Sequence, residues 1–182
     1  MLPDIIEEFS ISIDNELDIA HWKKEHNLIK VATASIESNI TDPTKRLYSV
    51  QPVEGQKIEY KTEQDLVYFL VFDGKIVKVG GTYTGLKKRV QSYYCGTRDN
   101  RERGTCSVTN YHVSEAIYAA LVANQVVEFY IFKIPQVHIT RLILGIEQEI
   151  TCTIYPAYEK SFIELYHQLV GHNPLLSKNK AA

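Results

Sequence analysis

The spacing of apolar residues predicts two strands and a helix in the middle of the chain. Residues 67–72 form an unbroken apolar run that is rich in β-branched and aromatic side chains, which is typical of a buried strand. The dipeptide Asp73-Gly74 favours a hairpin turn, and the strand pattern resumes at residues 76–79. The pair Gly80-Gly81 is expected to end this strand, and apolar residues then return at helical spacing over residues 86–94. The order predicts a β-hairpin that leads into a helix.

The flanking segments follow less regular patterns. Residues 14–28 are predicted as a helix, and residues 29–36 as a strand or as the end of that helix. We also expect a turn at 42–45, irregular or hairpin structure over 46–60, a helix over 114–124, a strand over 125–134 and two helices over 140–155 and 162–170. Thr140 is the expected N-cap of the first of these last two helices, and Pro156 is expected to end it. Three strands interleaved with helices predict a small α/β (α+β) sandwich.

Length and composition place the chain among ordinary globular proteins. Its 182 residues, 45% of them hydrophobic, suit one domain with an elaborated arm, which we place at residues 1–64, ahead of a main domain at 65–182. No apolar run reaches the ~18 residues of a membrane span, and the first residues lack a signal-peptide pattern. The three cysteines have neither disulfide-framework nor metal-site spacing. We therefore expect a cytoplasmic protein with reduced thiols and no membrane partner.

Charge is balanced overall but locally basic. The formal net charge of −2 argues against a protein that coats nucleic acid non-specifically. Residues 87–103 nevertheless hold six cations against two acids. The cations are Lys87, Lys88, Arg89, Arg98, Arg101 and Arg103. Such a local excess is compatible with an enzyme that binds DNA through one basic surface.

Three short stretches carry a family resemblance. Leu66-Val67-Tyr68 and Lys78-Val79-Gly80 resemble the two half-motifs of a GIY-YIG nuclease domain, and residues 86–94 are similar to the helix that follows them. That helix is especially similar to the one in the incision subunit of bacterial nucleotide excision repair. The resemblance covers about residues 65–159 and implies a three-stranded antiparallel sheet flanked by helices. Lys78 stands where the second motif has a tyrosine, a replacement that some GIY-YIG restriction enzymes share.

The resemblance implies roles for four of these residues. Tyr68 would activate or position the attacking water, and Arg89 would reach a phosphate oxygen. Tyr93, one helical turn after Arg89, would hydrogen-bond the phosphate or the water. A tyrosine, with a pKa of about 10, is a poor base at neutral pH unless a cation favours its phenolate, and Lys78 is the candidate cation. A two-residue turn would place Lys78 one position out of register with Tyr68, whereas a bulge would bring both to one face.

A divalent cation is expected to complete the site. The resemblance assigns a single Mg²⁺ to Glu147, which precedes the segment beginning at Pro156 by the family's spacing of nine residues, and the neighbouring Glu149 is expected to be a surface carboxylate. Two positions depart from the family pattern. Glu159 replaces an asparagine, and Gly81 stands where a lysine or histidine is common.

These features predict a Mg²⁺-dependent, sequence-specific endonuclease of double-stranded DNA, of the type II restriction class. Cutting both strands of a palindrome symmetrically needs two active sites, so we expect a homodimer. The arm at 1–64 and the arginine-rich loop at 96–110 would read the bases, and Arg98, Arg101 and Arg103 could contact guanine edges. The alternatives are another GIY-YIG nuclease that acts on damaged or branched DNA, and a catalytically inactive DNA-binding module.

Overall fold

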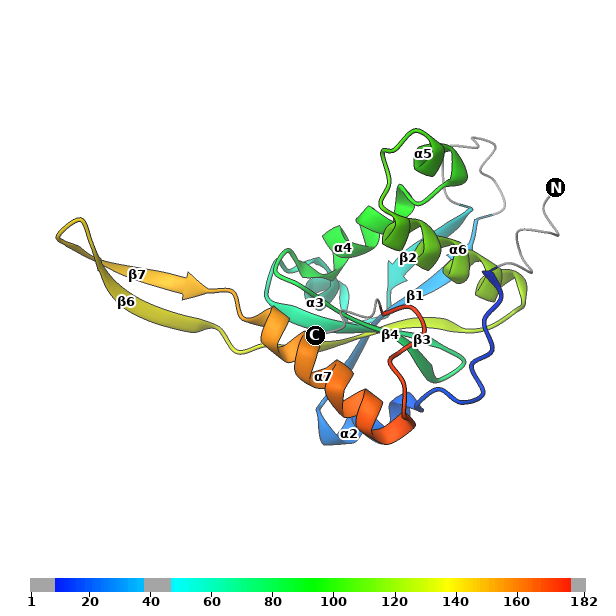
Figure 1. Ribbon diagram of the computed structural model, residues 1–182, viewed down its shortest axis with the longest axis horizontal. Coiled ribbons are helices and arrows are strands. Elements are labelled where there is room, and N and C mark those ends of the chain that lie inside the picture. Colours follow the sequence, from blue (N-terminus) through cyan, green and yellow to red (C-terminus); the bar gives the residue numbers. More distant parts are fainter. Residues whose placement is uncertain (1–8, 38–46, 178–182) are drawn as a thin grey trace.

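The computed structural model describes residues 9–37 and 47–177, and in it five antiparallel strands form one sheet between two layers of helices (Figure 1). The strand order is β2-β1-β5-β3-β4. The strands are β1 (Ile29–Ile36), β2 (Tyr48–Pro52), β3 (Leu66–Phe72), β4 (Lys75–Thr82) and β5 (Val127–Lys133). The mixed α+β class is as predicted, but the expected three-stranded sheet is too small. The difference arises because β1 pairs with β5, and β2 then pairs with β1.

The helices cover both faces of the sheet. They are α2 (Ile19–Glu25), α3 (Lys57–Lys61), α4 (Gly85–Tyr94), α5 (Arg98–Glu102), α6 (Val108–Val122) and α7 (Tyr155–Val170). Every residue of β3 is buried, which explains why its sequence is apolar without alternation. Among the described residues no helix is long and apolar enough to cross a membrane. The turn predicted at residues 42–45 lies outside the described residues.

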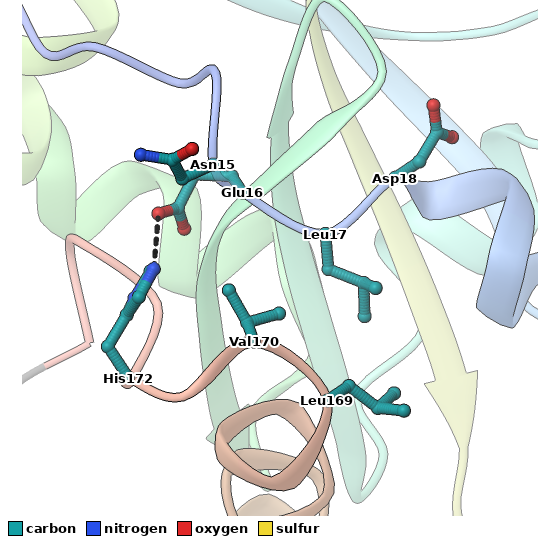
Figure 2. Close-up of a pocket in the computed structure, with 7 residues that line it drawn as sticks. All are labelled: Asn15, Glu16, Leu17, Asp18, Leu169, Val170 and His172. Atoms are coloured by element: carbon teal, nitrogen blue, oxygen red, sulfur yellow. Dashed lines mark ion pairs between the residues drawn. The ribbon is translucent and has the colours of Figure 1, made fainter.

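One face of the sheet packs on α2 and α7. Trp22, Phe69 and Phe162 meet there, with ring centroids 5.1–5.9 Å apart. The segment before α2 is fastened to the end of α7, because the hydroxyl of Tyr166 donates to the Glu16 carboxylate and His172 Nε2 lies 3.6 Å from Glu16 Oε1 (Figure 2). These contacts hold the segment before α2 against the C-terminal end of α7.

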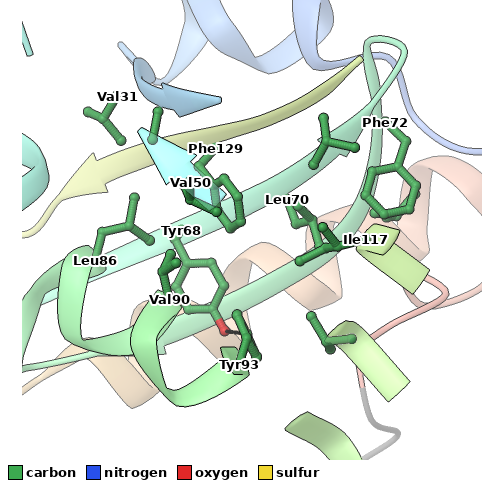
Figure 3. Packing of buried hydrophobic residues seen from close by; sticks show 14 of the residues in the cluster. Val31, Val50, Tyr68, Leu70, Phe72, Leu86, Val90, Tyr93, Ile117 and Phe129 are labelled. Carbon is green, nitrogen blue, oxygen red and sulfur yellow. Dashed lines mark hydrogen bonds between the residues drawn. The ribbon is translucent and has the colours of Figure 1, made fainter. Parts of the chain in front are cut away.

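The opposite face packs on α4 and α6. Tyr68, Leu70 and Phe72 point from β3 into this second core, where they meet Leu86, Val90 and Ile117 (Figure 3). Because alternate residues of a strand face opposite sides, the buried run of β3 supplies both cores at once. Tyr68 therefore points toward α4, the helix that carries Arg89 and Tyr93.

The helix predicted at residues 140–155 is wrong. The chain instead forms a two-stranded hairpin of β6 (Val137–Ile143) and β7 (Ile146–Cys152), which projects from the body (Figure 1). We call this hairpin the arm. Its turn residues Leu144 and Gly145 both have positive φ, at 52° and 82°, which suits a tight two-residue hairpin turn. Pro156 does not end a helix; it lies in the first turn of α7, where its missing N–H costs no hydrogen bond.

Candidate functional site

The site residues predicted on β3 and α4 converge. The hydroxyl oxygens of Tyr68 and Tyr93 lie 2.5 Å apart, and Arg89 Nε donates to the Tyr68 hydroxyl at 3.1 Å. The guanidinium also lies over the Tyr93 ring, 4.8 Å from its centroid. One helical turn separates Arg89 from Tyr93, so both side chains reach the same phenol. The Tyr68 oxygen is thus held by a cation on one side and by a second phenol on the other.

Burial sets the charge states in this cluster. Burial raises the pKa of Tyr93 well above its usual value, and the Tyr68 phenol adds to the rise while Arg89 opposes it. Tyr93 is therefore a neutral phenol at physiological pH. For Arg89, burial lowers the pKa, but Tyr68 and Tyr93 raise it more, so the net shift is upward and the guanidinium stays charged. A fixed positive charge thus sits beside the Tyr68 oxygen.

A β-bulge brings Lys78 to the same face of the sheet as Tyr68. Leu70 pairs with Lys78, but Val71 pairs with Ile76, so Val77 is an extra residue in β4. Tyr68 consequently lies opposite Gly80, with Lys78 two residues away along β4. The sequence left two registers open, and the structure shows the one in which Lys78 and Tyr68 share a face of the sheet. The Lys78 side chain is buried, and its ammonium donates to the Leu176 carbonyl at 2.8 Å.

The segment that supplies this carbonyl runs along the outer edge of β4. The Leu176 N–H donates to the Val77 carbonyl, and the Ser177 hydroxyl both accepts from the Val79 N–H and donates to the Val79 carbonyl. Ser177 is buried, as a polar side chain with two backbone partners can be. The sequence has no periodic pattern that predicts these contacts of Leu176 and Ser177.

The Gly80-Gly81 pair lies inside β4 and does not end it. A Cβ on Gly80 would lie 2.3 Å from the Tyr68 hydroxyl oxygen, and one on Gly81 would lie 2.2 Å from the Tyr155 ring and 2.9 Å from Glu159 Oε2. Glycine is required at both positions because side chains approach the bare backbone from opposite faces. Tyr68 and Glu159 therefore approach adjacent residues of β4, which is the edge strand of the sheet, from its two faces.

The carboxylate that lies beside Gly81 of β4 is Glu159, and Glu147 lies elsewhere. Glu159 is half-buried in the second turn of α7, next to Gly81. Glu147 is exposed on β7, opposite Leu142 and close to the turn of the arm, which extends away from the body that holds Tyr68 (Figure 1). The spacing that selected Glu147 presupposed a helix, so the structure removes its basis. The departure noted at Glu159 was the signal that pointed to the carboxylate at this edge.

The predicted DNA-binding cations lie on the surface around α4 and α5. Lys87 is exposed, and Lys88 pairs with Glu63 at 2.6 Å. Residues 98–102, predicted as part of a loop, form α5, whose arginines contact neighbouring groups. Arg98 pairs with Glu102, Arg103 pairs with Asp99, and Arg101 donates to the Cys106 carbonyl. Exposed pairs of this kind contribute little to stability and exchange readily for phosphate contacts.

Comparison with known proteins gives likeness only at the level of structure. No protein-family profile matches the chain, and no curated protein sequence matches it. Solved structures do match, including the following two. The structure of restriction endonuclease HPY188I in complex with product DNA is 27% identical, with a TM-score of 0.59 over 91% of this chain and 90% of that chain. A structure of a bacteriophage T4 EndoII mutant is 19% identical, with a TM-score of 0.57 over 83% of this chain and 96% of that chain. The second likeness concerns the fold alone.

Proposed function

We propose that this protein is an endonuclease that hydrolyses phosphodiester bonds of double-stranded DNA with a GIY-YIG-type active site. The observation that carries the proposal is the cluster of Tyr68, Arg89 and Tyr93, in which a half-buried cation and a neutral phenol both contact one phenol oxygen. The likeness to a restriction endonuclease bound to product DNA, across about nine-tenths of both chains, supports the same class of reaction.

Each residue has a chemical role in this proposal. A water molecule attacks phosphorus, and its proton passes to the Tyr68 oxygen, which must be ionised to accept it. The new oxygen–phosphorus bond forms as the bond to the leaving oxygen breaks. The leaving oxygen takes up a proton from solvent, and Tyr68 returns to solvent the proton that it accepted. Arg89 offsets the charge that grows on the phosphoryl oxygens, and it also donates a hydrogen bond to the Tyr68 oxygen. Tyr93 holds the Tyr68 oxygen in place.

We further propose that Glu159, and not Glu147, binds a Mg²⁺ ion. A single Mg²⁺ commonly uses one or two carboxylates, with waters and substrate oxygens filling the other positions. Because Gly81 has no side chain, Glu159 Oε2 can lie close to the backbone of β4. When bound there, Mg²⁺ would supply positive charge for the attacking or leaving oxygen.

We further propose that the protein cleaves DNA at a specific sequence and acts as a homodimer. The exposed Arg98, Arg101 and Arg103 on and after α5 would contact DNA, together with the N-terminal residues 1–64. The test is digestion of plasmid DNA with and without Mg²⁺, followed by sequencing of the new ends. Discrete fragments with a common end sequence support a restriction enzyme. Smearing, or cutting confined to branched DNA, would indicate the other nuclease classes. Absence of cleavage would indicate an inactive DNA-binding module.

A further inference from the structure

Two of the three cysteines lie in contact with each other. The sulfur atoms of Cys95 and Cys106 are 3.4 Å apart, although the residues are 11 positions apart in the chain. Both are free thiols, and the third cysteine, Cys152, is the last residue of β7. A disulfide bond joins sulfur atoms at about 2.05 Å, so an approach of roughly 1.4 Å would join Cys95 to Cys106.

The packing of α4 on α6 brings the two thiols together. Cys95 is the C-cap of α4, and Cys106 directly precedes Ser107, the N-cap of α6. The two helices contact each other, and Gly96 packs so closely that a Cβ there would lie 2.6 Å from the Asn110 carbonyl oxygen of α6. The proximity of the thiols is therefore set by the core of the protein and does not depend on the conformation of the chain between them.

The two thiols differ in their exposure to solvent. Cys95 is half-buried, whereas Cys106 is only 4% exposed. A small oxidant in solution would therefore reach Cys95 first, and would find Cys106 directly beside it. Redox-sensing cysteines are accessible to solvent and often lie next to a second cysteine that resolves the first oxidation product. The pair has this arrangement.

The chain between the two cysteines is the loop that carries α5, which leaves the end of α4 and returns at the start of α6 (Figure 1). Residues 96–105 include the three arginines that we propose to contact DNA. Arg98 pairs with Glu102 and Arg103 with Asp99 on the surface of this loop, and exposed ion pairs contribute little to stability. A disulfide across its ends would close the loop into a ring and restrict the positions that α5 can take.

We propose that Cys95 and Cys106 form a redox-sensitive site, at which hydrogen peroxide converts the two thiols into a reversible disulfide that constrains α5. The Cys95 sulfur, after losing its proton, attacks one peroxide oxygen. A sulfur–oxygen bond forms as the oxygen–oxygen bond breaks, and the released hydroxide takes up a proton to become water. The Cys106 sulfur then loses its proton and attacks the Cys95 sulfur, so that the sulfur–sulfur bond forms, the sulfur–oxygen bond breaks and a second water leaves. Peroxide gains the two electrons that the sulfurs lose, and an added dithiol reverses the change.

The disulfide is expected to weaken DNA binding, a consequence that rests on the proposed function. The new bond draws the ends of the loop closer together than they lie between the free thiols, so α5 shifts from its position in the reduced protein. Hydrogen bonds from arginine to phosphate or base edges depend steeply on distance and angle. We therefore expect the oxidised protein to bind DNA at least ~3-fold more weakly than the reduced protein, because a ring cannot adapt to DNA as an open loop does.

Peptide mapping of the full chain tests the site without DNA. The reduced protein is treated with hydrogen peroxide, its remaining thiols are alkylated with iodoacetamide, and it is digested with trypsin. We expect residues 90–98 to be joined to residues 104–133, with the loss of two hydrogen atoms, and dithiothreitol to separate them. Cys152→Ser, which removes the other half-buried thiol, should form the same link. Alkylation of both Cys95 and Cys106, or a link that involves Cys152 or a second chain, would overturn the proposal.

DNA affinity, measured without Mg²⁺ so that no cleavage occurs, tests the consequence. Oxidation should weaken binding by the natural sequence, dithiothreitol should restore it, and the double variant Cys95→Ser, Cys106→Ser should not respond to peroxide. Circular dichroism shows whether this variant is folded, and the peptide map of the natural sequence does not depend on it. A disulfide that leaves DNA affinity unchanged would overturn the effect on binding. A reduced protein that binds no DNA would contradict the proposed function instead, and the peptide map still decides whether the disulfide forms.

Discussion

The hydroxyl groups of Tyr68 and Tyr93 share a hydrogen bond of 2.5 Å, although the residues come from β3 and α4 and lie 25 positions apart in the chain. Arg89 contacts both phenols, so neither tyrosine can move without disturbing the cation. Arg89 Nε donates directly to the Tyr68 hydroxyl, which sets a cation beside that oxygen. This contact is why we place the acceptance of the water proton on Tyr68.

Gly80→Ala is expected to disrupt the site by contact alone. The added methyl group would lie 2.3 Å from the Tyr68 hydroxyl oxygen, so the phenol must move away from Arg89 and Tyr93. We predict loss of most DNA cleavage and a lower thermal midpoint. Gly104→Ala is the matched control, because no atom lies within 4 Å of its Cβ and only its positive φ makes the change unfavourable, by about 1 kcal/mol. Equal activity in the two variants would contradict the geometry.

Glu159→Gln and Glu147→Gln separate the two candidate metal ligands. Glu159→Gln removes the negative charge beside Gly81, and we expect at least ~100-fold slower cleavage at a fixed Mg²⁺ concentration, partly restored at higher Mg²⁺. Glu147→Gln changes an exposed residue of the arm and should leave the rate within about two-fold. Titrating the cleavage rate against Mg²⁺ measures both effects. Inactive Glu147→Gln beside active Glu159→Gln would return the metal to the arm.

Alkaline pH should weaken the fold through its buried phenols. The pKa of Tyr93 is raised in the folded protein, mainly by burial, so this phenol stays protonated there after it ionises in the unfolded chain. Its contribution to stability is fully present below about pH 10, the unfolded pKa, and is lost as the pH rises toward the folded value. Tyr130, whose pKa burial and Glu128 raise to about 12, acts in the same direction.

Urea unfolding between pH 8 and 11.5 measures this dependence. The free energy of unfolding should fall above about pH 10 in the natural sequence, and less steeply in Tyr93→Phe, which has no phenol to ionise at this position. An identical slope in both proteins would show that Tyr93 is not the group responsible.

The arginines of α5 should determine how the protein selects DNA. Replacing Arg98, Arg101 and Arg103 with alanine removes three cations that make only exposed or backbone contacts within the chain, so the fold should survive. We predict loss of site selection. We also predict that the slope of the logarithm of DNA affinity against the logarithm of salt concentration becomes shallower by up to about three. Binding measured over a range of salt concentrations, with sequencing of cleaved ends, tests both. Unchanged end sequences would refute the assignment.

The sequence predicted the local elements of the site well. The run at residues 67–72, the Asp73-Gly74 turn and the helical spacing over 86–94 all depend on neighbouring residues, and each element forms as expected. The bulge at Val77 could not be predicted, because it depends on how β4 packs between β3 and the segment that holds Ser177. Yet this bulge is what places Lys78 on the face of Tyr68.

The arm was mistaken for a helix for a physical reason. Ile139 and Ile143 are four residues apart, as are Ile146 and Ile150, and the two-residue turn inserts a spacing of three between the pairs. Spacings of four, three and four match an amphipathic helix as well as two alternating strands. The short turn at Leu144-Gly145 and the abundance of β-branched residues were the signals that favoured strands. The helix prediction was also the basis for assigning the metal to Glu147, and the hairpin removes that basis.

The most direct test compares Tyr68→Phe with Tyr94→Phe in Mg²⁺-dependent cleavage of plasmid DNA. Each variant loses one buried or half-buried hydroxyl. The Tyr94 hydroxyl accepts a hydrogen bond from the Val50 backbone N–H, so its loss should cost about 1 kcal/mol of stability and little activity. Tyr68→Phe should still bind DNA but cleave at least ~100-fold more slowly than the natural sequence. Cleavage by Tyr68→Phe at the rate of Tyr94→Phe would contradict the assignment of Tyr68 as the base.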